Sequence, residues 1–469
     1  MNPFSPPDSL LIDGIPVTLP VLNGDKESLS PKATFQKPCW VPDGEAHSCL
    51  NCGLKFSQLR RKHHCRNCGK IFCSKCCSGK MCLPHFDINE PEKVCLNCLL
   101  IVELMTKSKS EDMSLKYEAV TGLCNLTKTT SGLCKVIESG GIHIMLSMTV
   151  NGDLNLKCAI ASALHSITQS MMLNSFLVEA GCLKALKNLL ETSHDCNELL
   201  NDSLSALNLL CMDPNIRIKV LKEGFVPSLF TVVRCTGTSA VFAARILQFL
   251  VCNFDHHDFI LQNHKHIISD LFDGFQNEDY QMQTCLSKML MHFSAGSDTF
   301  RQLILQEDIS RGFPLLYLLK GSSPNVLINA VCIIANFSLQ MNQEFSHKYI
   351  TALCELLTFL TDDSSDVLAH VGRGLANFAE CSSNSLHLVH NLQTIALKLL
   401  KSTSEAPRIH GCRLINYLFS SEPTFTLDIL SQSGMDEFIE TIFDLPGITD
   451  VLNNLLLRKV SRLSISQKL

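Results

Sequence analysis

Residues 49–76 read CLNCGLKFSQLRRKHHCRNCGKIFCSKC, and a further CLNC follows at 95–98. Each of the four Cys-x-x-Cys pairs places two sulfurs on one short turn, and eight thiolates suit two tetrahedral all-cysteine zinc sites. Structural zinc contributes on the order of 10–16 kcal/mol, so the sequence predicts a small domain that holds two zinc ions and does not fold without them. The expected zinc ligands are Cys49, Cys52, Cys65, Cys68, Cys73, Cys76, Cys95 and Cys98.

The remaining cysteines do not share this spacing. Cys39, Cys77 and Cys82 lie beside the pairs and are interpreted as non-ligands. Thirteen of the 24 cysteines are scattered singly from Cys124 to Cys412 among apolar neighbours. Isolated cysteines of this kind are usually buried small hydrophobic residues, so a disulfide framework is the poorer interpretation.

Charge is distributed unevenly along the chain. From Trp40 to Cys98 there are nine Lys/Arg and five Asp/Glu, a balance of +4, which leaves -9 for the rest of a chain whose net charge is -5. No acidic residue occurs between Ala46 and Phe86. Four-thiolate zinc sites hold part of this positive charge, and the remainder predicts an anionic ligand for the cysteine-rich domain. The whole chain is too acidic for a typical nucleic-acid-binding protein.

Three separated motifs in this domain resemble those of FYVE-type zinc fingers. Residues 40–43 read WVPD and match the family's WxxD, residues 61–66 read RKHHCR and match R(R/K)HHCR, and residues 93–95 read KVC where the family has RVC. The resemblance implies a cross-braced fold in which the first and third cysteine pairs share one zinc and the second and fourth pairs share the other. It also implies binding of phosphatidylinositol 3-phosphate on endosomal membranes.

The side chains in these motifs suit a phosphorylated head group. A phosphomonoester carries a charge of about -1.5 to -2 and strong acceptors, which basic side chains can neutralise. The four bases are expected to bind phosphate, and the two histidines to donate to the inositol ring or its phosphate, more tightly as the pH falls through about 6.5. The aspartate is expected to accept from inositol hydroxyls and to exclude other isomers. The expected lipid-binding residues are Asp43, Arg61, Lys62, His63, His64, Arg66 and Lys93.

Other interpretations of the same residues remain open. One of the two histidines could be a zinc ligand, although eight cysteines already fill both sites, and the basic run at 60–62 could be a solvated surface. Lys93 lacks the planar fork with which arginine grips phosphate. In the loop at 56–60 only Leu59 is an apolar side chain expected to enter a bilayer, and one buried side chain contributes only about 1.5–3 kcal/mol. Avidity is then needed for tight membrane binding.

From about Leu115 the sequence has helical periodicity with a long repeat. Segments close to Leu-x-Asn-Leu recur at spacings of 40, 43, 40, 44, 44, 41 and 39 residues, and a glycine opening an apolar run follows the same period. Units of this length are typical of armadillo and HEAT solenoids, and the run from Gly181 to Leu209 resembles an armadillo repeat. The marker positions are Asn125, His165, Asn208, Gln248, His292, Asn336, Asn377 and Asn416, and the glycines are Gly140, Gly181, Gly224, Gly312 and Gly434.

The resemblance to armadillo proteins implies a groove in which a ladder of asparagines holds an extended peptide backbone of a protein partner. Five of the eight marker positions are asparagine, but His165, Gln248 and His292 interrupt the ladder. The alternative is that the asparagines cap buried backbone groups within their own repeats.

The predicted fold is therefore a small zinc-stabilised cross-braced FYVE finger followed by an all-α armadillo/HEAT-like superhelical solenoid. A flexible tail is expected at 1–37, the finger at 38–100, a short helix at 99–107, about eight repeats at 115–446, and a capping helix or tail at 447–469. No apolar run approaches the roughly 18 residues of a membrane-spanning helix, and no secretory signal is present, which predicts a cytoplasmic protein.

The sequence contains no catalytic motif of the phosphate-loop, HExxH or GxSxG kind, so no catalytic residue is predicted. The leading hypothesis is a non-enzymatic adaptor, peripheral on endosomes, whose finger binds the phosphoinositide and whose solenoid binds a protein. One alternative is a protein-interaction scaffold whose finger has lost lipid specificity. A ubiquitin ligase is the other, since RING fingers are also cross-braced, but they normally use a histidine ligand and lack both the WxxD and HHCR motifs.

Overall fold

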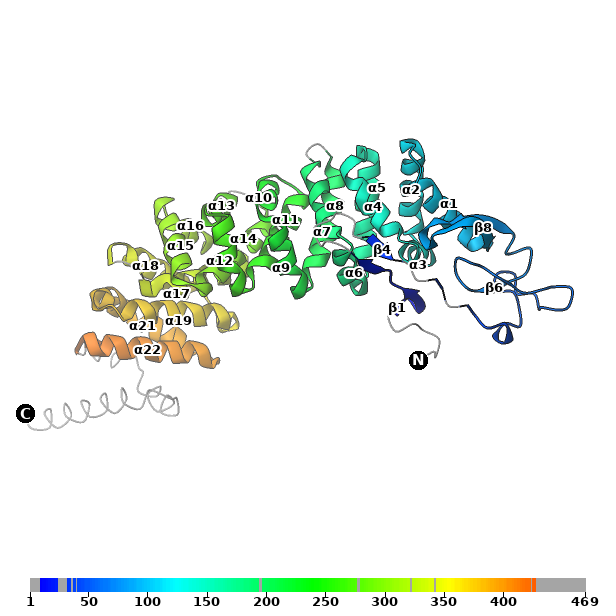
Figure 1. Cartoon of the computed structure of the whole chain (residues 1–469). Coiled ribbons are helices and arrows are strands. Elements are labelled where there is room, and N and C mark those ends of the chain that lie inside the picture. The colour runs from blue at the N-terminus through cyan, green and yellow to red at the C-terminus, as the bar shows by residue number, and fades with distance from the viewer. Residues whose placement is uncertain are drawn as a thin grey trace, which may run out of the picture. The chain divides into compact units, whose positions relative to one another are not determined.

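The computed structural model describes residues 9–23, 32–34, 37–38, 40–193, 196–275, 279–320, 323–340, 343–422 and 424–426. The chain divides into two compact units, Met1–Leu250 and Val251–Leu469, and each is described by itself. Figure 1 labels the helices and strands of both units. The end of the last expected repeat, 427–446, and the expected capping segment, 447–469, lie outside the described residues.

The cysteine-rich domain contains two short antiparallel ladders. His63 pairs with Phe72 in one ladder, and Gly79 pairs with Val94 in the other. Ile71, Phe72, Leu83 and Val94 are buried, but so few apolar side chains form only a small core. The elements are η1 (Asp43–Glu45), β5 (His63–His64), β6 (Ile71–Phe72), β7 (Gly79–Leu83), η2 (Pro84–Phe86) and β8 (Ile88–Val94).

Helix α1 (Leu96–Ser108) joins this domain directly to the helical repeats. It begins inside the fourth cysteine pair and packs against α2 (Met113–Leu126). Lys135 Nζ, on α3 (Thr130–Glu138), donates to the Asn97 carbonyl oxygen at 2.7 Å. The domain and the first repeat are therefore packed together within the first unit.

The N-terminal region differs from the flexible tail expected for residues 1–37. Strands β1 (Ser9–Ile12) and β2 (Ile15–Thr18) form an antiparallel hairpin that packs against α3. Asp13 and Gly14 have φ angles of 47° and 78°, as a two-residue type I′ turn requires. The Asp-Gly pair between apolar residues is therefore the sequence feature that indicates this hairpin. A second ladder pairs β3 (Val21–Asn23) with β4 (Lys32–Thr34).

The first unit repeats a pattern of three helices. Helices α2, α5 and α8 pack one against the next, and the glycines before α4 and α7 adopt φ angles of 77° and 96° that favour glycine. The helices after α3 are α4 (Gly141–Asn151), α5 (Leu154–Thr168), α6 (Asn174–Glu179, after η3, Met171–Leu173), α7 (Cys182–Glu191), α8 (Asn197–Cys211), α9 (Pro214–Glu223), α10 (Val226–Val233) and α11 (Thr238–Val251).

The second unit continues the pattern, with α14, α17, α19 and α22 packed in series. Its α-helices are α12 (His257–Asn263), α13 (Ile267–Gly274), α14 (Tyr280–Gly296), α15 (Asp298–Ser310), α16 (Pro314–Leu318), α17 (Pro324–Phe337), α18 (Gln343–Phe359), α19 (Ser365–Ala379), α20 (Ser385–His390), α21 (Leu392–Leu400) and α22 (Glu405–Ser421). The 3-10 turns are η4 (Phe254–His256), η5 (Ser338–Gln340), η6 (Asp362–Ser364) and η7 (Ser382–Asn384).

The predicted repeat period is confirmed. The eight marker positions fall toward the C-terminal ends of eight different helices, namely α2, α5, α8, α11, α14, α17, α19 and α22. Gly224 and Gly312 have positive φ like the two earlier glycines, whereas Gly434 lies outside the described residues. The glycine is absent near Tyr349, where α18 runs on as one helix of 17 residues, and near His266, where α12 and α13 remain separate. Where the glycine is present, it lies at a turn between two helices of a repeat.

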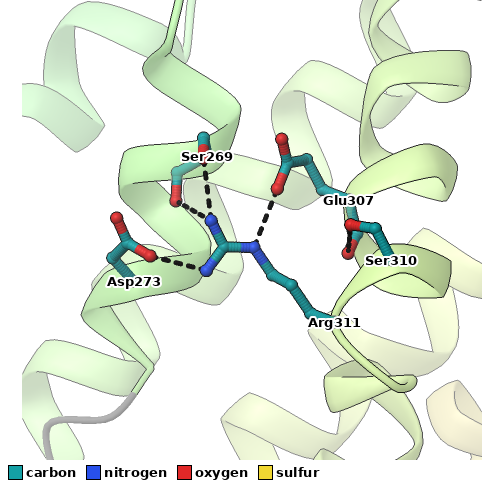
Figure 2. A network of polar contacts seen from close by, with 5 residues as sticks. All are labelled: Ser269, Asp273, Glu307, Ser310 and Arg311. Atoms are coloured by element: carbon teal, nitrogen blue, oxygen red, sulfur yellow. Dashed lines mark hydrogen bonds and ion pairs between the residues drawn. The ribbon is translucent and has the colours of Figure 1, made fainter.

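Arg311 joins two helices of the second unit. Its guanidinium donates to Asp273 Oδ1 at 2.5 Å and to Ser269 Oγ at 2.7 Å on α13, and to Glu307 Oε2 at 2.8 Å on α15 (Figure 2). Its side chain is 29% exposed. The Arg311 guanidinium therefore connects α13 with α15.

Replacing Arg311 by Met should lower the free energy of unfolding by about 1 kcal/mol, because a partly exposed charged network contributes only modestly. Urea unfolding followed by circular dichroism measures the change. Lys320→Met, which removes an exposed charge from the same unit, is the control and should leave the urea midpoint unchanged. Equal midpoints for the two variants would contradict a stabilising role for the network.

Among the described helices, none is by itself both long and apolar enough to cross a bilayer. Helices α3 and α4 pass that test only as a pair bent by 83°.

Candidate metal centres and head-group site

The eight cysteines come together as two groups of four. Within each group the sulfur atoms all lie within 4.8 Å of one another. Zn–S bonds of about 2.3 Å in a tetrahedron place the sulfurs about 3.8 Å apart, and the sulfurs of Cys52 and Cys73 are 3.9 Å apart. The groups are Cys49, Cys52, Cys73 and Cys76, and Cys65, Cys68, Cys95 and Cys98. The first pair thus joins the third and the second joins the fourth, as the cross-brace requires.

Backbone amides donate to one sulfur in each group of four cysteines. The amides of Cys73 and Cys95 donate to the sulfurs of Cys49 and Cys65 at 3.3 and 3.2 Å. Burial raises the pKa of Cys49, but hydrogen bonds from the backbone of Cys52, Cys73 and Asn51 lower it to about 6. Zinc ligands must be deprotonated, which the pKa of Cys49 favours, and the two groups of four sulfurs fit two zinc ions.

Other candidate ligands lie outside both groups. Neither group contains a histidine among the described residues. Burial raises the pKa of Cys77 to about 12, and the sulfur of Cys82 donates to the Asn89 carbonyl oxygen. Cys39 lies outside the described residues. The alternative of a histidine ligand therefore finds no support in the geometry.

The WxxD segment and the basic strand meet through a three-layer stack. The Trp40 ring lies 4.6 Å from the His64 ring with an interplanar angle of 19°. The Arg66 guanidinium lies 4.2 Å from the centre of the Trp40 ring. The Val41 amide donates to the Gly69 carbonyl oxygen, which fixes the segment on the turn of the second cysteine pair. Trp40 therefore holds two of the predicted lipid-binding side chains in place.

Asp43 lies at the edge of the same stack. Its carboxylate is 68% exposed and lies 3.9 Å from His64 Nε2, which in turn contacts the Val41 carbonyl oxygen at 2.8 Å. Lys62 Nζ donates to the backbone oxygen of Asp43. The aspartate is thus beside the basic strand with its carboxylate free to meet a ligand's hydroxyl groups.

Strand β8 brings Lys93 to the basic strand from 30 residues away. The Arg66 amide donates to the Lys93 carbonyl oxygen at 2.9 Å, and Lys93 Nζ lies 3.1 Å from His63 Nδ1. Burial, followed by the charges of Lys93 and Arg61, lowers the pKa of His63. The protonation expected near pH 6.5 therefore moves to lower pH for this side chain.

Two features of the site were not found from the sequence. Lys80 is the cross-strand partner of Lys93 between β7 and β8, so a further base accompanies the predicted ones. Leu59, the predicted apolar side chain, is 99% exposed, but Leu50 and Leu54 in the preceding segment are also 63% and 51% exposed. Lys80 lies in none of the three motifs. Only the pairing of β7 with β8 places it beside Lys93.

The charges within the site are partly balanced. Arg66 Nε lies 3.3 Å from Glu92 Oε2, and both side chains are partly exposed. Arg61 is exposed. The predicted residues Asp43, Lys62, His63, His64, Arg66 and Lys93 are linked by the contacts above, whereas Arg61 adjoins them in sequence and by its charge effect on His63.

The asparagines of the second unit connect neighbouring repeats. Asn377 Nδ2 donates to the Ala335 carbonyl oxygen at 2.9 Å and to Ser338 Oγ at 3.0 Å. Asn336 Nδ2 donates to Ser294 Oγ at 2.8 Å. Ala335 and Ser294 belong to the preceding repeat, so these two bonds join neighbouring repeats instead of capping backbone groups within one repeat. The amide donors of Asn377 are already engaged without a peptide.

Comparisons with known proteins agree with both parts of the fold. The family model described as FYVE zinc finger matches residues 39–103. An engineered protein of known structure matches with a TM-score of 0.51 at 17% identity, over 78% of this chain and 98% of that chain, which shows the fold. A designed armadillo repeat protein in complex with peptide (KR)4 has a TM-score of 0.41 at 15% identity, over 51% of this chain and 99% of that one.

The chain thus carries a FYVE zinc finger with two four-cysteine clusters, followed by armadillo-like helical repeats. Such an arrangement is typical of adaptors that bind membranes or proteins. Both folds are typically non-catalytic.

Proposed function

We propose that this protein is a non-enzymatic adaptor whose finger binds phosphatidylinositol 3-phosphate on endosomal membranes and whose repeats bind a protein partner. The observation that carries the proposal is the stack of Trp40 with His64 and Arg66, because it assembles the separated motifs of a FYVE finger into one basic site. The eight clustered cysteines are the proposed zinc ligands. Zinc, when bound, supplies only the cross-links that hold this site in shape.

The proposed division of roles follows from charge and position. Arg61, Lys62, Arg66 and Lys93 supply charge-assisted hydrogen bonds to the phosphate. His63 and His64 donate to the ring or the phosphate from the middle of the basic strand. The exposed Asp43 carboxylate accepts from inositol hydroxyls and repels isomers phosphorylated at those positions. Exposed Leu59 enters the bilayer.

The proposal places the protein in the cytoplasm, peripheral on endosomes, with no role in nucleic-acid binding. The match to the FYVE model supports it over a RING-type ligase. The contact of Lys93 Nζ with His63 Nδ1 supports it over a finger that has lost lipid specificity, since the lysine still lies at the basic strand.

Sedimentation with vesicles tests the lipid half of the proposal. The purified zinc-loaded chain is mixed with vesicles containing phosphatidylinositol 3-phosphate or the 5-phosphate isomer. We expect selective binding to the 3-phosphate, and a loss of at least about tenfold in affinity in the Arg61→Ala, His64→Ala double variant, since two donors are removed.

Lys75→Ala is the matched control, because Lys75 is an exposed base of the same finger outside all three motifs. It should bind vesicles like the unaltered protein. Equal binding to both isomers, or none, by a chain that holds its two zinc ions would refute lipid recognition and leave the finger as a protein-binding module.

A further inference from the structure

A cavity of about 540 Å³ lies within the second unit, lined by side chains from α14, α15, α17, η5 and α19. Its polar lining residues are Asp298, Arg301, Asn336, Gln340, Arg373 and Asn377. Leu339, which also lines it, is 59% exposed. We name this cavity the Arg373 pocket.

The two arginines of the Arg373 pocket differ in how their charge is balanced. Arg301 forms an ion pair with Asp298, three residues before it on α15. Arg373 instead contacts the Cys332 carbonyl oxygen at 3.5 Å and His370 Nδ1 at 3.3 Å, and no carboxylate of a described residue lies within 4.0 Å. Its Nε is buried without a hydrogen-bond partner among the described residues. One guanidinium in the pocket therefore lacks a counter-ion.

The next repeat extends this basic surface. Arg413 on α22 donates to Asn377 Oδ1 and lies 5.7 Å from the centre of the Tyr417 ring, with no described carboxylate within 4.0 Å. Because α19 and α22 pack side by side, Arg373 and Arg413 lie on successive helices of the stack. Two uncompensated cations are thus carried by neighbouring repeats.

Acidic and basic side chains are unevenly placed on the helices around the pocket. Helices α14, α17, α19 and α22 carry four Lys/Arg and two Asp/Glu, whereas α15 carries one Arg and three Asp/Glu. On α19 and α22 the acids, Asp366 and Glu405, stand in the first turn of their helices. The arginines occur later in those helices, so the acidic and basic side chains are separated along each one.

We propose that the Arg373 pocket and the adjoining Arg413 bind an acidic segment of a partner protein. An aspartate or glutamate side chain enters between Arg301 and Arg373, where charge-assisted hydrogen bonds replace the missing counter-ion. The Gln340 Oε1 atom, which is buried without a partner among the described residues, accepts a backbone N–H of the segment. A basic segment is excluded by like-charge repulsion. This inference rests on the proposed adaptor function and specifies its protein partner.

Fluorescence anisotropy of rhodamine-labelled octapeptides tests the inference on the full zinc-loaded chain. The probes are alternating Glu-Asp, Gln-Asn and Lys-Arg peptides. We expect the acidic peptide to bind at least tenfold more tightly than the other two. Arg373→Glu should weaken acidic-peptide binding at least tenfold, while Lys219→Glu, the same charge change at an exposed position of the first unit, should not.

Arg373→Met and a thermal unfolding curve separate loss of binding from loss of folding, since Met keeps much of the side chain's volume without its charge. A folded Arg373→Met variant that binds the acidic peptide like the unaltered protein would overturn the proposal, as would equal binding of all three peptides. Vesicle sedimentation of the same variant distinguishes this failure from that of the lipid site. It should bind phosphatidylinositol 3-phosphate vesicles normally whether or not the peptide binds.

Discussion

Removing zinc with a chelator is expected to unfold the finger, residues 39–103, while the helical repeats keep most of their helix signal. The finger has two short ladders and few buried apolar side chains, so its own core contributes little. Two structural zinc ions contribute on the order of 10 kcal/mol or more each, which exceeds the stability of most whole domains. Trp40 is the only tryptophan of the chain and stacks on His64, so its fluorescence reports this transition directly.

Single substitutions separate the two clusters from the neighbouring thiols. Cys73→Ser removes one ligand of the first cluster and should lower the measured zinc content from two ions per chain toward one. Cys82→Ser is the control, because Cys82 lies in neither cluster and contacts only the Asn89 carbonyl oxygen in the hydrogen bonds described. If Cys73→Ser retained two tightly held ions, or if the chelated protein kept its Trp40 spectrum, the ligand assignment would be wrong.

The finger could be predicted because the spacing of its cysteines indicates how they bind zinc. Eight cysteines in four pairs leave few ways to build two tetrahedral sites, and the family motif supplied the pairing that spacing alone leaves open. The exposed bases could be named for the same reason, since they lie inside a motif. Lys80 could not, because its place beside Lys93 depends on the register of β7 and β8.

The repeats were predictable as a period but not in their contacts. A marker every 39 to 44 residues fixes which helices are equivalent, since each repeat must bury the same face against its neighbour. The hydrogen bond from Asn377 to Ala335 and the ion pairs of Arg311 depend on how side chains of successive repeats meet, which no local pattern encodes. The N-terminal hairpin was missed for a different reason. Its Asp13-Gly14 turn is a strong local signal, but the surrounding Pro and Ser residues masked it.

The second unit contains a buried carboxylate whose surroundings make its stability depend on pH. Asp308 on α15 is fully buried, and it accepts hydrogen bonds from the Tyr349 hydroxyl at 2.5 Å and from the Leu315 amide at 2.8 Å. Burial raises the pKa of Asp308 to about 6, against the lowering effect of these two donors. The carboxyl group therefore holds its proton more tightly in the folded than in the unfolded chain.

This difference predicts that the second unit loses stability as the pH rises from about 4 to about 6. Below pH 4 Asp308 is protonated in both states, whereas between these values only the folded state keeps the proton, and above pH 6 the folded state must bury a charge. A pKa moved from 3.8 to about 6 corresponds to roughly 3 kcal/mol over that window. Asp308→Asn stays neutral throughout. Every other group titrates in both proteins, so the difference between their stabilities reports the titration of Asp308 alone.

Hydrogen exchange of the amides in α15, α16 and α18, measured at several pH values and corrected for intrinsic rates, follows this difference locally. Relative to Asp308→Asn, the unaltered protein should lose protection steadily from pH 4 to pH 6 and then level off. Asp298→Asn is the control, because its carboxylate is 71% exposed and its pKa is lowered by Arg301, so its pH effect has the opposite sign. A stability difference between wild type and Asp308→Asn that stays constant across this window would mean that Asp308 is charged when folded, and that its two donors outweigh the cost of burial.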